Sequence, residues 1–150
     1  MYYPLFIDLK NKKILVIGGG RVGSRRALYL LKAGALVTVI SKEFDKKLKI
    51  KNKNLKLIKR DITKTKINLS DYFLVVVATN DKKINEKITN KTKKINKKLK
   101  NKIMICRADS YLNGDVVFPA YIAKKGIGIT SFGKNPKIIK RIKNFISREV

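Results

Sequence analysis

The sequence lacks histidine and tryptophan and has a single cysteine, Cys106, among its 150 residues. The absence of histidine excludes imidazole-based catalytic triads and His-ligated zinc sites, because both need a nitrogen that titrates near neutral pH or coordinates metal. One cysteine cannot form an intrachain disulfide, which fits a reducing compartment. We therefore predict no metal site and expect Cys106 to be a buried strand residue.

Long apolar runs are also absent. No stretch reaches the roughly 18 consecutive apolar residues that a membrane-spanning helix requires. The opening segment, Met1–Asp8, is short and closes with an acid, unlike a signal peptide. We therefore expect no membrane partner and a cytoplasmic location.

Acidic residues are few: 10 Asp and Glu stand against 37 Lys and Arg, a formal net charge of +27. Such a charge attracts anions. Most of the basic residues are lysine, whereas base recognition and phosphate clamping favour the planar arginine fork, so we expect no nucleic-acid partner. A solvated lysine-rich surface and a patch that binds a polyanionic small molecule both remain open.

Strand-like and helical patterns alternate over the first three quarters of the chain. The β-branched run that begins at Lys13 stops at glycines and passes into a helical pattern ending at Gly34, and Leu36–Ile40 follows as a second strand. This βαβ unit predicts a right-handed crossover. Three more strand-like runs and one helical stretch, from Asp81 to Lys100, complete the series; the runs are Leu55–Ile58, Tyr72–Ala78 and Lys102–Cys106. Residues 1–112 are therefore predicted to form a Rossmann-like α/β domain with an open parallel sheet.

The pattern changes in residues 113–150. Two strand-like runs, Val116–Ile122 and Gly126–Ser131, look antiparallel, and Asn135-Pro136 is typical of a helix start. Apolar side chains then recur on one helical face, at Ile138, Ile139, Ile142, Phe145 and Ile146. A segment this small cannot hide such a face alone, so we predict that it packs on a second copy and makes a homodimer.

A glycine-rich motif follows the first strand. Gly18, Gly20 and Gly23 fit the G-x-G-x-x-G pattern of dinucleotide-binding turns, with a strand before and a helix after. Gly18 allows the turn, Gly20 lets the backbone approach a pyrophosphate, and Gly23 permits close contact between helix and strand. The motif predicts a cofactor site that includes the intervening Arg21 and Val22.

The residue that reads the adenosine ribose is expected about twenty positions further on. Here the chain has Ser41, Lys42 and Glu43. Glu43 could reach the ribose hydroxyls and favour NAD, whereas Ser41 and Lys42 could accommodate the 2′-phosphate of NADP. The residues alone leave the two open, with NAD as the expected cofactor.

Polar residues follow two later strands at the edge where such sheets bind ligands. Thr79 and Asn80 are predicted to contact the nicotinamide ribose, although Asn80 or Asp81 could simply cap the next helix. Asp109 follows the fifth strand and is the candidate catalytic acid or base. The alternative for Asp109 is a turn-forming role before Ser110.

Together these features resemble the precorrin-2 dehydrogenase module of siroheme synthases. The similarity extends from Tyr3 to Arg148, and the Phe118-Pro119 pair downstream of Asp109 distinguishes it from ordinary Rossmann proteins. The segments that carry it are Tyr3–Leu9, the Lys-Ile-Leu-Val-Ile-Gly-Gly-Gly-Arg-Val run, Leu-Leu-Lys-Ala-Gly-Ala-Leu-Val-Thr-Val and Val-Val-Ala-Thr-Asn-Asp.

The resemblance implies NAD-dependent oxidation of precorrin-2 to sirohydrochlorin in siroheme biosynthesis, a homodimer, and Asp109 at the position of the catalytic aspartate. A lysine-lined cleft would then hold the carboxylates of the substrate. Ser131 matches a family serine and is a weaker substrate-binding candidate, because the residues after it, Phe132 to Pro136, depart from the family pattern. Bifunctional members also insert iron, which leaves ferrochelatase activity open. A non-catalytic NAD-sensing regulatory domain is the alternative function, and it would need no acid over the nicotinamide.

Overall fold

The computed structural model describes Tyr3, residues 5–110, 113–118, 120–124 and 127–131, and Arg141. The chain divides into two compact units, Met1–Val116 and Val117–Val150. The boundary expected from the sequence, between residues 112 and 113, falls slightly before this division.

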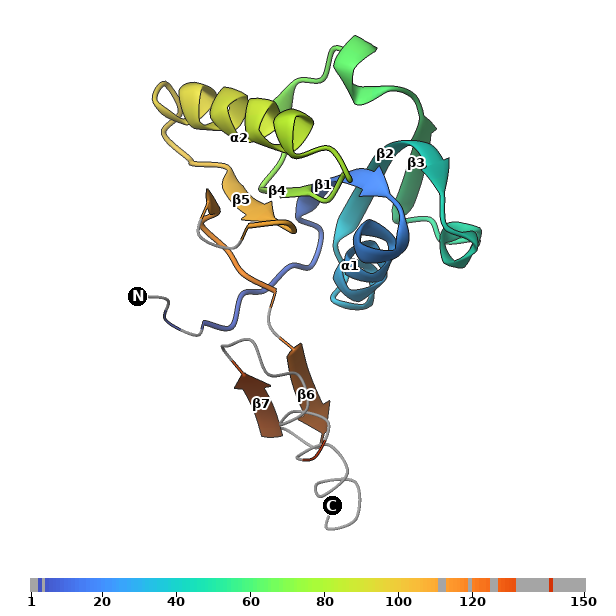
Figure 1. Cartoon of the computed structure of the whole chain (residues 1–150). Coiled ribbons are helices and arrows are strands. Elements are labelled where there is room, and N and C mark those ends of the chain that lie inside the picture. The colour runs from blue at the N-terminus through green and yellow to red at the C-terminus, as the bar shows by residue number, and fades with distance from the viewer. Residues whose placement is uncertain are drawn as a thin grey trace. The chain divides into compact units, whose positions relative to one another are not determined.

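The first unit contains a five-stranded parallel sheet with the order β3-β2-β1-β4-β5 (Figure 1). The chain crosses from one edge of this sheet to the far side of β1 between β3 and β4, so the strand order reverses between β1 and β4. Ligands of open α/β sheets bind at the carboxyl ends of the strands beside such a reversal. The strands are β1 (Lys13–Gly19), β2 (Leu36–Phe44), β3 (Leu55–Lys59), β4 (Leu74–Val77) and β5 (Met104–Arg107). The predicted Rossmann-like sheet is confirmed.

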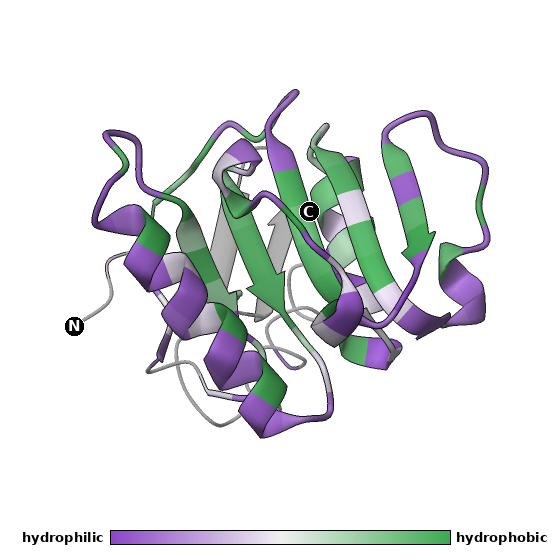
Figure 2. Cartoon of the chain, turned by 90° about the horizontal axis from the view of Figure 1, so that it is seen from above, coloured by the Kyte–Doolittle hydropathy of each residue, from purple (hydrophilic) through white to green (hydrophobic). Residues whose placement is uncertain are grey.

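Two helices cover the sheet, α1 (Arg21–Lys32) on one face and α2 (Lys82–Asn96) on the other (Figure 2). Opposite faces are expected for right-handed crossovers that lead to opposite sides of β1. Short 3-10 helices occupy the other connections: η1 (Lys46–Leu48), η2 (Ile62–Lys64) and η3 (Leu69–Asp71).

The core lies on both faces of the central strands. All four residues of β4 are buried, and β1 is buried from Ile14 onward, as expected of parallel strands covered by helices on both sides. The predicted apolar stripe of α2 packs here through Ile88, with Ile84 and Ile95 partly buried against the same cluster. Cys106 is buried in β5, as predicted.

Helix α1 ends at a glycine in the left-handed conformation, Gly34, with φ of +80°. The Gly34 N–H donates to the Leu31 carbonyl at 3.0 Å, and the Ala35 N–H donates to the Leu30 carbonyl at 3.1 Å. This pair of bonds is the Schellman arrangement, which glycine adopts without steric cost. The predicted helix end at Gly34 is confirmed, and β2 begins directly after it.

Strand β2 is longer than the sequence indicated. The expected end at Ile40 is wrong, because the strand continues to Phe44. A register shift between Ile17 and Gly19 in β1 lets Gly19 pair with Phe44, an irregularity that extends the contact between the strands. Ser41, Lys42 and Glu43 therefore lie within the last part of β2.

The second unit contains the antiparallel pair β6 (Ala120–Lys124) and β7 (Ile127–Ser131). The predicted antiparallel pairing is confirmed, although β6 begins at Ala120 rather than Val116. The predicted helix after Asn135-Pro136, and the apolar face assigned to dimerisation, lie outside the described residues apart from Arg141.

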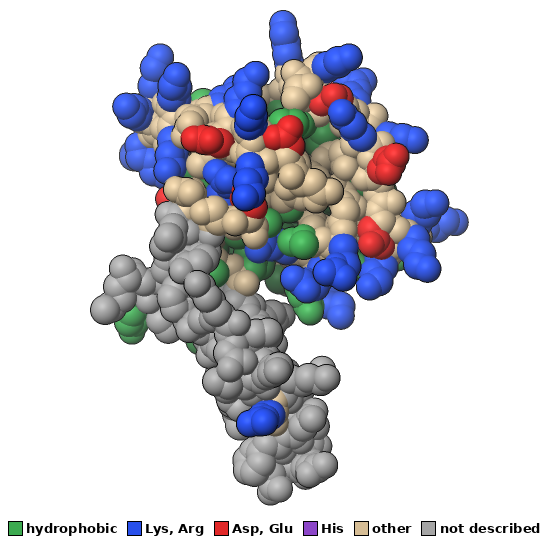
Figure 3. All heavy atoms as spheres, viewed as in Figure 1, with side chains coloured by type: hydrophobic (Ala, Val, Ile, Leu, Met, Phe, Trp, Pro, Cys, Tyr) green, Lys and Arg blue, Asp and Glu red, His purple; other side chains and the backbone are tan. Residues whose placement is uncertain are grey.

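Lysine and arginine side chains are spread over the surface of the first unit, with few acids between them (Figure 3). The charge is thus distributed rather than confined to one element. Among the described helices, none is long and apolar enough to cross a membrane.

Candidate functional site

The glycine turn joins β1 to α1 at the carboxyl edge of the sheet. Gly18 has φ of +104°, and a Cβ there would lie 2.4 Å from the Ala78 carbonyl oxygen of the neighbouring strand's end. A Cβ on Gly23 would lie only 1.9 Å from the Gly18 carbonyl oxygen. Both positions therefore require glycine, one for its conformation and the close approach of residue 78, the other for contact between helix and turn.

Gly20 is glycine for a different reason. A Cβ there would meet nothing within 4 Å, so the space before this residue is open. Gly20 is also the N-cap of α1 and offers no side-chain cap, and the first turn has no acid. The N–H groups of Arg21, Val22 and Gly23 have no acceptor within the helix, which makes this terminus favourable for an anion.

The Ser24 side chain of α1 fixes the conformation of the turn. Ser24 Oγ lies 2.8 Å from the carbonyl oxygens of both Gly19 and Gly20 and donates to them. A fixed turn with open space in front and free N–H groups fits the pyrophosphate of a dinucleotide. The part of the predicted site formed by Gly18, Gly20 and Gly23 thus has the geometry such a ligand requires.

The expected ribose-reading residues lie beside the turn. A Cβ placed on Gly19 would lie 3.0 Å from Ser41 Cβ and 2.6 Å from the Glu43 carbonyl oxygen, so the end of β2 packs directly against the glycine turn. Gly19 therefore also requires glycine, which the sequence analysis missed. The motif pattern leaves that position unrestricted, and only the strand irregularity brings β2 so close.

Lys42 has a partner that the sequence analysis also missed. Its Nζ lies 3.0 Å from Asp61 Oδ2, just after β3, while the Lys42 side chain remains 71% exposed. Hydrogen bonds from the Thr63 hydroxyl and backbone N–H, followed by Lys42, lower the pKa of Asp61 to about 2. The indication in the sequence was an acid two residues after the end of the third strand.

A buried side-chain amide holds the polar residue Thr79, which follows β4, in place. Asn85 of α2 is fully buried, and its Oδ1 lies 2.5 Å from Thr79 Oγ1, which donates to it. Asn85 Nδ2 donates to the Thr79 carbonyl at 3.0 Å. Asp81 caps α2 by accepting from the backbone N–H groups of Lys83 and Ile84. The capping alternative therefore holds for Asp81, and Asn80 is exposed at the sheet edge.

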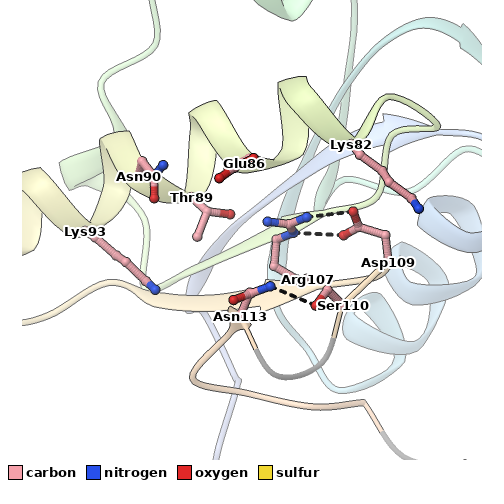
Figure 4. Close-up of a pocket in the computed structure, with 9 residues that line it drawn as sticks. All are labelled: Lys82, Glu86, Thr89, Asn90, Lys93, Arg107, Asp109, Ser110 and Asn113. Carbon is pink, nitrogen blue, oxygen red and sulfur yellow. Dashed lines mark hydrogen bonds and ion pairs between the residues drawn. The ribbon is translucent and has the colours of Figure 1, made fainter.

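Asp109 follows β5 and is bound by Arg107, the last residue of that strand (Figure 4). Arg107 Nε donates to Asp109 Oδ1 at 2.8 Å, and Nη2 donates to Oδ2 at 2.6 Å. The two side chains are 7% and 17% exposed, respectively. Asp109 was predicted from the sequence as a site residue and Arg107 was not, although their spacing of two residues is visible in Arg107-Ala-Asp109.

This ion pair stabilises the charged form of the candidate catalytic group. The hydrogen bonds from Arg107 lower the pKa of Asp109 to about 2, against the opposing effect of burial and with a smaller contribution from Asn85. The same contact raises the pKa of Arg107. Asp109 is therefore ionised at neutral pH and ready to accept a proton or stabilise a cation, but the pairing weakens it as a base.

A polar pocket of about 400 Å³ lies between α2 and the end of β5 and includes the Arg107–Asp109 pair (Figure 4). Three of its lining residues are cationic and two are anionic, so it favours a negatively charged group. The lining residues are Lys82, Glu86, Thr89, Asn90, Lys93, Arg107, Asp109, Ser110 and Asn113. Ser131, the weaker substrate-binding candidate, lies in β7 of the second unit, and its role stays a prediction.

Comparisons with known proteins show which families and chains this one resembles. A family model described as "Putative NAD(P)-binding" matches residues 5–120. A "Putative precorrin-2 dehydrogenase" of Methanocaldococcus jannaschii is 36% identical over 154 residues, covering 95% of this chain and 71% of the relative. A "Precorrin-2 dehydrogenase" of Priestia megaterium is 30% identical over 154 residues, covering 97% of this chain and 69% of the relative.

Longer proteins and a solved structure match as well. A "Siroheme synthase" of Buchnera aphidicola is 35% identical over 147 residues, which cover 97% of this chain but 30% of that protein. The solved structure of SirC, a precorrin-2 dehydrogenase, matches with a TM-score of 0.72 at 27% identity, covering 99% of this chain and 71% of its own. The chain thus spans about a third of the siroheme synthase and about 70% of the dehydrogenases.

Proposed function

Because the chain belongs to the precorrin-2 dehydrogenase family, we propose that it oxidises precorrin-2 to sirohydrochlorin with NAD as the hydride acceptor. Family membership confirms the resemblance inferred from the sequence, and the family model supports a nicotinamide cofactor. The observation that carries the proposal is the open glycine turn at Gly20 on the same sheet edge as the ionised Asp109. A domain that only senses NAD has no need for the second feature.

The glycine turn would hold the cofactor through its pyrophosphate. The N–H groups of Arg21, Val22 and Gly23 supply the donors, and Gly20 leaves room for the phosphates. When bound, the nicotinamide supplies the hydride acceptor. Val77 pairs with Arg107, so the ends of β4 and β5 lie side by side. Thr79 and Asn80, which follow β4, therefore lie at the same sheet edge as the residues that follow β5. They are our candidates for contacting the nicotinamide ribose.

The ribose-reading segment favours NAD over NADP. Ser41 and the backbone of Glu43 pack against the turn, and their side chains are our candidates for contacting the ribose hydroxyls. Lys42, the cation best placed for a 2′-phosphate, is already paired with Asp61 at 3.0 Å. A 2′-phosphate would have to displace that carboxylate and would meet its negative charge.

Asp109 is the proposed catalytic residue. Removing a hydride from a reduced tetrapyrrole leaves a cation that must lose a proton, and one positioned carboxylate can stabilise the cation and accept the proton. Arg107 stabilises the charged form of Asp109 and holds the carboxylate in place before the substrate arrives. The lysine-rich surface and Ser131 are proposed to assist by attracting and binding the substrate's carboxylates.

The proposed homodimer is supported by an exposed apolar segment ahead of β1. Leu5, Phe6 and Ile7 are exposed by 72%, 100% and 45% in a stretch that carries part of the family resemblance. Consecutive exposed apolar side chains indicate a surface that a partner covers. A second copy of the chain is the partner we propose.

The function is tested by an anaerobic assay with precorrin-2 in which NADH absorbance is followed, with NAD and NADP in parallel. NAD-dependent turnover to sirohydrochlorin supports the dehydrogenase, and absence of turnover despite NAD binding supports the sensing domain instead. Adding ferrous or cobaltous ion to the product then decides whether the chain also inserts metal.

A further inference from the structure

Arg107 uses only part of its guanidinium on Asp109. Arginine carries five N–H donors in a planar fork, and the Asp109 carboxylate accepts from Nε and from one N–H of Nη2. No acceptor in the described part of the chain is bonded to Nη1. The edge formed by Nη1 and Nη2 therefore has N–H groups that are available to a ligand, although the Arg107 side chain is only 7% exposed.

The surroundings of this edge favour an anion. Arg107 lines the polar pocket together with Lys82 and Lys93 of α2. Glu86 is the one acid of α2 on the pocket wall, and it acts on Arg107 only as the weakest influence on its pKa. Asp109, the other acid of the lining, is occupied by its two hydrogen bonds from Arg107. The remaining lining residues are neutral hydrogen-bonding groups: Thr89, Asn90, Ser110 and Asn113.

We propose that the free edge of Arg107 binds a carboxylate of the tetrapyrrole substrate, flanked by Lys82 and Lys93, while the other edge keeps hold of Asp109. The proposal rests on the proposed function and specifies how that site recognises its substrate. A planar carboxylate matches two parallel N–H donors of a guanidinium, which a lysine ammonium cannot reproduce. A pocket of about 400 Å³ admits one acidic side chain, with the macrocycle outside it.

This arrangement would give Arg107 two roles through one rigid group. It contacts the substrate directly, and it fixes Asp109 at a set distance from the bound carboxylate. The substrate is then oriented relative to the proton acceptor by a single planar side chain, without any need to break the ion pair.

The test compares Arg107→Lys, which keeps the charge but removes the fork, with the wild type. The measured quantities are the KM for precorrin-2, the Kd of sirohydrochlorin from its fluorescence, and the Kd of NADH as a check on folding. We expect Arg107→Lys to raise the first two about 10- to 100-fold and to leave NADH binding unchanged. Glu86→Gln, which removes the opposing charge, should lower both values.

Two matched lysine variants keep the test valid should Arg107→Lys fail to fold. Lys93→Gln lies on the pocket wall and should raise the Kd of sirohydrochlorin several-fold, whereas Lys83→Gln, on the same helix but outside the lining, should not. Equal effects of the two lysine variants would overturn the proposal.

The proposal and the function can fail separately. An unchanged KM and Kd in Arg107→Lys, with only the pH dependence of kcat altered, would show that Arg107 acts solely through Asp109 and would overturn substrate contact. Absence of turnover in the wild type, with product binding still dependent on Arg107, would overturn the dehydrogenase function and leave the carboxylate site standing.

Discussion

Arg107 and Asp109, two residues apart at the end of β5, form a two-point ion pair with donor–acceptor distances of 2.8 and 2.6 Å. Arg107 is the last residue of β5, and the chain bends at residues 108 and 109, directly after the strand, where Asp109 meets the guanidinium. The pair lowers the pKa of Asp109 to about 2 and so stabilises its charged form, and several predictions depend on it.

The first prediction concerns catalysis. Asp109→Asn keeps a hydrogen-bond acceptor for Arg107 but removes the negative charge, so it should lower kcat by about 100-fold or more. NADH binding, measured by fluorescence titration, should stay within about twofold, because the glycine turn is untouched. A variant with wild-type kcat would remove Asp109 from the mechanism.

The second prediction concerns acid stability. The pKa of Asp109 is lowered to about 2 from 3.8, so the ion pair stabilises the fold fully above pH 4 and loses this contribution as the pH falls toward 2. The full contribution is about 2 kcal/mol, with roughly half gone near pH 3. Urea unfolding of the wild type and Asp109→Asn at pH 7 and pH 3 measures it. A stability difference between the two proteins that is independent of pH would contradict the assignment.

The third prediction separates the roles of two glycines. Gly20→Ala places a methyl group in open space at a φ of −74°, so it should fold normally and bind NAD more weakly. Gly20→Asp should abolish binding, because its carboxylate would lie where the pyrophosphate belongs.

Gly23→Ala should instead destabilise the fold, since its Cβ would collide with the Gly18 carbonyl. Thermal unfolding and isothermal titration with NAD distinguish these outcomes, and normal NAD affinity in Gly20→Asp would rule out the turn as the cofactor site.

The fourth prediction concerns the choice between NAD and NADP. Asp61→Asn frees Lys42 from its ion pair, so it should shift the ratio of kcat/KM values toward NADP by about 2- to 5-fold. Asp71→Asn, which changes a carboxylate in η3, serves as the control for altered net charge. Equal shifts in the two variants would show that Lys42 has no specific role.

The fifth prediction concerns association. Phe6→Ser should move the protein from dimer toward monomer in sedimentation measurements, because it removes a fully exposed aromatic ring from the apolar segment. Leu57→Ser, at a partly exposed position of β3, is the matched control and should leave the dimer intact. A monomeric wild type would refute the homodimer.

The sequence by itself determined the parallel α/β architecture, the antiparallel pairing in the second unit, the glycine turn and the family. These follow from local patterns, since continuous apolar runs mark covered parallel strands and glycine spacing marks a tight turn between strand and helix. The positions of Gly34 and the apolar stripe of α2 were predicted for the same reason.

Only the tertiary structure decided which side chains meet. The irregularity at Gly19 extended β2 and brought Ser41 and the backbone of Glu43 against the turn. The pairing of β3 with β2 placed Asp61, two residues after β3, next to Lys42. Likewise, the packing of α2 buried Asn85 beneath Thr79. These contacts depend on how separate elements pack, and residues distant in the chain carry no local periodicity that reports their proximity. The lowered pKa of Asp109 arose in the same way, because the shift of a carboxyl pKa depends on the group's neighbours and its burial rather than on its place in a motif.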